Sequence, residues 1–123
     1  MNQRAQIRLL PDGRRLHLHD GPIDLIVEAF GVARQVEVVY RTAGARFVTV
    51  LDELCGELSC LRRACSPEAA WPQGAVARRM VAAVMAYATQ YFITPMAAVA
   101  GAVAEEILAV SYTHLTLPTI LRV

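Results

Sequence analysis

Residues 5–30 read AQIRLLPDGRRLHLHDGPIDLIVEAF, and this stretch decides the fold. Polar and apolar residues alternate within it, which is the pattern of half-buried β-strands. Proline, aspartate and glycine interrupt the alternation, because proline presets one backbone dihedral and glycine tolerates a positive one. Three strands so close together predict an antiparallel meander. The strands are expected at 5–10, 14–19 and 23–30, with turns at 11–13 and 20–22.

The chain after these strands has helical periodicity. Apolar residues step by three or four from Val36 to Leu61, which predicts one long amphipathic helix. Gly44 and Gly56 lie inside it, each at a cost of about 1 kcal/mol relative to alanine, which packing on the sheet must offset. Strands packed against helices make the predicted fold class α+β. A second helix is expected over Val76–Tyr87, strand character over Tyr91–Ile93, and a third helix from Met96 to about Ala109.

The third helix has an unusual composition. Residues 97–104 read AAVAGAVA and contain neither a charge nor a bulky side chain. A helix that is apolar on all sides is buried. Its small residues would let a neighbouring backbone or a flat ligand approach closely.

The charge and composition of the chain indicate which classes of partner it can bind. The chain has 12 basic residues, all of them arginine, and 11 acidic ones. Without Arg122 the balance is neutral, which supports neither a nucleic-acid nor an anionic-membrane partner. The N-terminal residues lack an apolar signal core, and the apolar run 96–104 is shorter than the roughly 20 residues of a membrane span. These features predict a soluble, cytoplasmic protein.

The cysteines and common motifs point to no standard site. Cys55, Cys60 and Cys65 are five residues apart, with no CxxC pair and no matching histidines, so we expect reduced, partly buried thiols. The GxGxxG, P-loop, GxSxG and HExxH patterns do not occur.

The C-terminal segment differs from the rest of the chain. The run Val110–Thr119 resembles a translated sequencing adapter, and alanine gives way to threonine and leucine there. We therefore expect residues 1–109 to be part of a native domain and residues 110–123 to be foreign, so that His114 belongs to no site.

Several segments resemble an uncharacterised bacterial and archaeal family of the ApbE superfamily of flavin-binding proteins. The resemblance covers nearly all of residues 5–109, and the Thr-Pro-Met-Ala-Ala-Val-Ala-Gly run is its most specific part. The segments that carry it are 11–18, 21–31, 76–84 and 92–106.

This resemblance implies an incomplete ApbE-like domain that binds a flavin. The best-known superfamily members use FAD and Mg²⁺ to transfer FMN to a threonine of a target protein. Aligned on Gly101, the chain has Ala100 at the position of a lysine and Glu105 at that of an aspartate, while Met96-Ala97 replaces a glycine pair. These departures leave two alternatives, an FMN transferase in the full-length protein or a non-catalytic binding module, with this fragment inactive. The resemblance does not identify catalytic residues, a substrate or an oligomeric state.

A phosphate site at the third helix also has a physical basis. Thr94 can cap the helix, Pro95 suits its first position, and a helix N-terminus attracts a pyrophosphate. Together with this argument, the resemblance makes Thr94, Met96, Ala97 and Gly101 the candidate cofactor-binding residues, and the resemblance alone implies Glu105 as the candidate metal ligand. The alternative is close packing of helix on sheet, with Glu105 and Glu106 as exposed acids.

Other residues have both a functional and a structural interpretation. His17 and His19 lie on one side of a strand at a spacing that can bind a metal, or they belong to a solvated face. Trp71 can stack on an isoalloxazine ring or cover the edge of the core. The pairs Arg62-Arg63 and Arg78-Arg79 can hold a phosphate or face solvent.

Overall fold

The computed structural model describes residues 4–113 and 120–123, which form two compact units. The first unit contains residues 1–51 and 107–123, and the second contains residues 52–106. The expected adapter segment falls partly on residues 114–119, outside the described residues. Its first residues continue a helix, and Ile120–Arg122 forms a short strand, β4.

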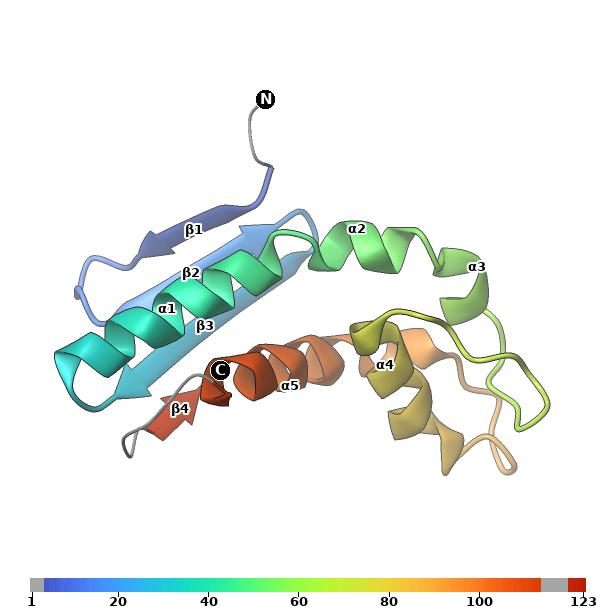
Figure 1. Ribbon diagram of the computed structural model, residues 1–123. Helices are drawn as coiled ribbons and strands as arrows, with labels where there is room; N and C mark the ends of the chain where they lie inside the picture. The colour runs from blue at the N-terminus through green and yellow to red at the C-terminus, as the bar shows by residue number, and fades with distance from the viewer. Residues whose placement is uncertain (1–3, 114–119) are drawn as a thin grey trace. The chain divides into compact units, whose positions relative to one another are not determined.

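The first unit is built on an antiparallel sheet with the strand order β1-β2-β3-β4 (Figure 1). The predicted meander is confirmed: β1 is Gln6–Leu9, β2 is Arg15–Asp20 and β3 is Ile23–Phe30. The two turns depend on glycine, since Gly13 and Gly21 have φ angles of 70° and 59°, where a side chain is strained.

One face of this sheet packs against helix α1, Ala33–Phe47. Leu16 and Leu18 of β2 and Val27 of β3 are buried on that face, together with Ala43 and Phe47 of α1. The alternation in the sequence therefore places apolar residues inward, and the residues between them point to the opposite face.

The predicted long helix is wrong, because the structure divides it into α1, α2 (Val50–Cys55) and α3 (Leu58–Leu61). The first break follows Phe47, at the β-branched residues Val48 and Thr49, and the second coincides with Gly56; both kinds of residue have low helix propensity. Leu54 and Leu61 are buried as the periodicity predicts, so the apolar spacing survives the breaks.

The second unit contains the second predicted helix, which is confirmed as α4, Ala75–Met85. Val76, Met80 and Val84 of its predicted stripe are buried, whereas Tyr87 lies beyond the helix and is 53% exposed. The strand predicted over residues 91–93 is wrong, because this segment is a bend followed by irregular backbone. Its carbonyl at Ile93 accepts a hydrogen bond from the Cys65 N–H at 2.7 Å.

The third predicted helix begins as a short 3-10 helix, η1 (Pro95–Ala98), and continues as α5 (Val99–Tyr112). The prediction that it is buried on all sides is wrong. Ala102 and Val103 are buried, but Ala97, Ala100 and Gly101 are exposed. Because methyl groups contribute little apolar area, one side of such a helix can face water at low cost.

Among the described residues, Pro95–Tyr112 is the one helical stretch that is long and apolar enough to cross a membrane, with a mean hydropathy of 1.2. This is weak evidence for a span, since core helices of soluble proteins pass the same test.

Candidate metal site

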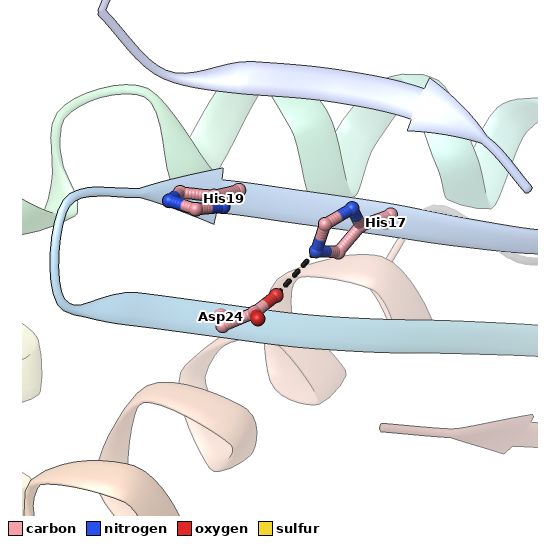
Figure 2. A group of neighbouring side chains, drawn as sticks. All are labelled: His17, His19 and Asp24. Carbon is pink, nitrogen blue, oxygen red and sulfur yellow. Dashed lines mark hydrogen bonds and ion pairs between the residues drawn. The ribbon is translucent and has the colours of Figure 1, made fainter.

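Three potential metal ligands gather on the sheet face opposite α1 (Figure 2). His17 and His19 come from β2, and Asp24 comes from β3. The neighbours of the histidines, Leu16 and Leu18, are buried on the other face, so strand alternation directs both imidazoles to the same side.

The strand register brings Asp24 to the histidines. His19 is the direct cross-strand partner of Asp24, and His17 lies opposite Ile26. Direct antiparallel partners have Cβ atoms about 4.5–5.5 Å apart, and diagonal neighbours remain within reach of longer side chains. Asp24 therefore lies within reach of both histidines from a single place on β3.

The tight turn between β2 and β3 fixes this register. Asp20 pairs with Ile23, which leaves a two-residue loop at Gly21 and Pro22. The Asp20 side chain is fully buried and binds Arg4, with Arg4 Nε 2.5 Å from Asp20 Oδ1 and Arg4 Nη2 3.1 Å from Asp20 Oδ2. Asp20 therefore stabilises the end of the hairpin and is not a further ligand.

The ligand atoms of the three residues all lie within 4.8 Å of one another. Tetrahedral zinc with bonds of about 2.0–2.1 Å needs ligand atoms about 3.3 Å apart, so side-chain rotations of modest size would complete the site. The His17 Nε2 atom is hydrogen-bonded to Asp24 Oδ1, and a metal ion would replace this contact. The two imidazole rings meet edge to face, with centroids 5.8 Å apart.

The donor set selects among metals. Two imidazole nitrogens and one carboxylate oxygen suit Zn²⁺, Co²⁺, Ni²⁺ or Cu²⁺, whereas Mg²⁺ and Ca²⁺ prefer oxygen ligands. Two neutral histidines and one aspartate carry a charge of −1, which compensates part of a divalent ion. Asp24 is 63% exposed and His17 is 18% exposed, so an ion bound here would keep a side open to solvent.

The sequence alone identified both histidines but missed Asp24. The signal was present in the turn: a two-residue loop at Gly21-Pro22 places residue 19 opposite residue 24. The turn residues indicate where the strands end, and the register of the two strands brings the third ligand into place.

The residues predicted to bind a cofactor, Thr94, Met96, Ala97 and Gly101, belong to the second unit. Thr94 precedes η1 with an extended backbone, and its side chain makes no capping hydrogen bond. Met96 and Ala97 are exposed, and an added Cβ at Gly101 would have no atom within 4 Å. The flavin site at these residues stays a prediction.

The predicted metal ligand Glu105 belongs to a different arrangement. Its Oε1 atom lies 2.5 Å from Arg79 Nη1, and Arg79 Nε lies 3.1 Å from Glu106 Oε1. Arg78 stacks on Trp71, with its guanidinium carbon 5.1 Å from the ring centroid, and donates to the Pro72 carbonyl. These side chains line an open groove of about 490 Å³, formed by Trp71, Arg78, Arg79, Ala82, Ala83 and Glu105.

The three cysteines are free thiols in different environments. Cys55 is exposed, Cys60 is half-buried and Cys65 is buried. Burial raises the pKa of the Cys65 thiol, and the nearby Cys60 adds to the effect.

Comparison with known proteins corrects the family prediction. No curated protein and no solved structure matches the chain. The family model that matches, described as AbpE bacteria, covers residues 7–120. It is not the model of an FMN transferase family, and nothing links the chain to the ApbE superfamily, so the resemblance stated from the sequence is wrong. With a match over almost its entire length, the chain belongs to the family described as AbpE bacteria.

Proposed function

We propose that the protein binds a divalent transition-metal ion through His17, His19 and Asp24. The observation that carries this proposal is the grouping of three ligand atoms within 4.8 Å of one another on a sheet. Strands hold side chains in fixed places, so much of the entropic cost of assembling a metal site is met when the hairpin folds.

The number of protein ligands decides whether the proposed metal site is closed or keeps an open coordination position. Structural zinc sites are closed by four protein ligands, whereas sites with three protein ligands keep a position for water or substrate. A site of the second kind polarises what it binds and lowers the pKa of coordinated water. We therefore infer a metal centre with an open coordination position rather than a closed structural site.

Metal binding is measured directly on a chain without a polyhistidine tag. We expect Co²⁺ or Zn²⁺ to bind with one-to-one stoichiometry in isothermal titration calorimetry. His19→Asn and Asp24→Asn each remove one ligand and should weaken binding strongly. Glu37→Gln is the matched control, because Glu37 is an exposed carboxylate on α1 whose side chain is 72% exposed. Binding that survives both ligand substitutions unchanged would exclude this site.

A second candidate function is binding of a flavin, as FAD or FMN, or of a nucleotide by the second unit. It is supported by the groove in which Trp71 offers a ring face and Arg78 and Arg79 carry positive charge. Mg²⁺ near Glu105 would belong to this candidate, as would transfer of FMN to a protein or, as the alternative, a non-catalytic binding role. Three free cysteines support a cytoplasmic location for either function.

Titration with FAD, followed by flavin fluorescence with and without Mg²⁺, tests this second candidate. Trp71→Ala should abolish the change if the flavin lies in the groove. Gly101→Leu should abolish it if the flavin lies at the start of α5, and the open space around Gly101 makes that variant sterically tolerable. No fluorescence change at micromolar FAD would reject both positions.

A further inference from the structure

We propose that the metal-loaded site binds a small oxyanion, a phosphate or carboxylate group, between the metal ion and Arg8. This inference rests on the proposed metal function and adds the class of ligand that the open position accepts.

The register places Arg8 next to the site. In the β1–β2 pair, Arg8 is the direct partner of His17, and Gln6 is the direct partner of His19. Direct partners in an antiparallel pair direct their side chains to the same face. Arg8 and Gln6 therefore border the histidines on the side away from Asp24, and both are exposed.

Arg8 differs from the other arginines of the strands in its partners. Arg15 of β2 pairs with Asp12 at 2.7 Å, and Arg122 of β4 pairs with Glu28 at 2.6 Å. Within residues 4–113 and 120–123, no carboxylate forms an ion pair with Arg8. Its five N–H donors are thus available, and a planar guanidinium matches the oxygens of phosphate and carboxylate groups.

Charge explains why a metal and Arg8 would share an anion. A divalent ion, one carboxylate and two neutral imidazoles sum to +1, and Arg8 raises the local charge to +2. Two neighbouring cationic centres repel each other, and an anion that lies between them attracts both and offsets this repulsion. The anion would fill the open coordination position with one oxygen and accept hydrogen bonds from Arg8 with another.

Ile26 borders His17 on the side opposite Arg8 and offers the anion no hydrogen-bond donor there. It is the partner of His17 on β3 and shares the face, with 39% of its surface exposed. Its aliphatic side chain offers no hydrogen bond, so Arg8 is the charged donor that the register places beside His17.

The cobalt form of the protein provides the test. We expect phosphate to change the visible absorption of bound Co²⁺, and acetate distinguishes a preference for a carboxylate from one for phosphate. Arg8→Gln should keep the Co²⁺ affinity and weaken the phosphate effect by about tenfold or more, as expected for the loss of one charge-assisted contact. Arg34→Gln, on α1, is the matched control and should leave both measurements unchanged.

The outcomes separate the two proposals. If Co²⁺ does not bind to the wild-type chain, both the metal function and the anion site are wrong. If Co²⁺ binds but neither anion changes the spectrum, or Arg8→Gln responds like the wild type, only the anion site is wrong. Circular dichroism of Arg8→Gln shows whether β1 still folds, and Arg8→Lys, which keeps the charge but loses the fork of donors, should give an intermediate response.

Discussion

His19 lies directly across the β2–β3 hairpin from Asp24, and the diagonal neighbour His17 is hydrogen-bonded to the same carboxylate. Two histidines and an aspartate that are separated along the chain thus share one small patch of a sheet (Figure 2). The relationship depends on the pairing of two strands and on the loop that joins them, so it can be tested through metal binding and through the turn.

Zinc should raise the thermal stability of the wild-type protein. A ligand that binds only the folded state adds about 2.7 kcal/mol when its concentration is 100 times Kd, which raises Tm by several degrees for a chain of this size. Differential scanning fluorimetry with and without zinc measures the shift. His19→Asn should lose the shift while keeping its metal-free Tm close to that of the wild type, and an equal shift in both proteins would argue against this site.

Gly21→Ala should destabilise the protein by about 1–2 kcal/mol, because Gly21 has a left-handed backbone that strains a residue with a Cβ atom. An added Cβ would also lie 3.3 Å from Leu51 Cδ2. Urea unfolding measures the loss, and the same variant should bind metal more weakly because the turn sets the register of His19 and Asp24.

Gly56→Ala is the comparison for that measurement. An added Cβ at Gly56 meets backbone oxygens at ordinary contact distances of 3.5 Å, and its φ is not positive. We expect no loss of stability there, so equal losses at Gly21 and Gly56 would mean that strain at the turn is not the cause.

Glu57→Ala should destabilise the protein by about 0.5–1.5 kcal/mol, the usual net contribution of an intramolecular hydrogen bond, because it removes an acceptor from the backbone that leads into α4. The Glu57 carboxylate accepts hydrogen bonds from the N–H groups of Gln73 at 2.7 Å and Gly74 at 2.8 Å, where α4 begins. A negative charge also favours this end of the helix dipole. Chemical unfolding of Glu57→Ala beside Glu37→Gln checks the prediction, and similar small effects in both would show that these two hydrogen bonds contribute nothing.

The Asp12 carboxyl should titrate at a pKa of about 2, well below its ordinary value of 3.8. The largest cause is the hydrogen bond from the Arg14 N–H, followed by the Arg15 side chain and the Arg15 N–H. Because the folded-state pKa is lowered, the stabilisation is fully present above the ordinary value and is lost as the pH falls through about 2.

A titration of the Asp12 carboxyl carbon by NMR measures this pKa directly. The stability of Asp12→Asn should fall below that of the wild type at neutral pH, and the difference should shrink on acidification. A carboxyl that titrates at its ordinary value would show that the turn hydrogen bonds do not form in solution.

The sequence by itself determined the strands and their faces. Alternation over residues 5–30 and the glycines of the two turns are local properties, so the meander, the buried Leu16, Leu18 and Val27, and the shared side of His17 and His19 all follow from neighbouring residues. The apolar stripe of α4 is local in the same sense. Family membership was not determined in this way, since similarity of short segments led to the wrong family.

Only the tertiary structure decided where helices end and which distant side chains meet. Apolar spacing is the same in one long helix and in three short ones, so periodicity could not show the breaks after Phe47 and at Gly56. Asp24 became a potential ligand through strand register, since a slip of one residue would have turned it to the other face. Trp71 and Glu105 line one groove because Arg78 of α4 stacks on Trp71 and Arg79 of α4 pairs with Glu105, and no local pattern encodes such contacts between distant segments.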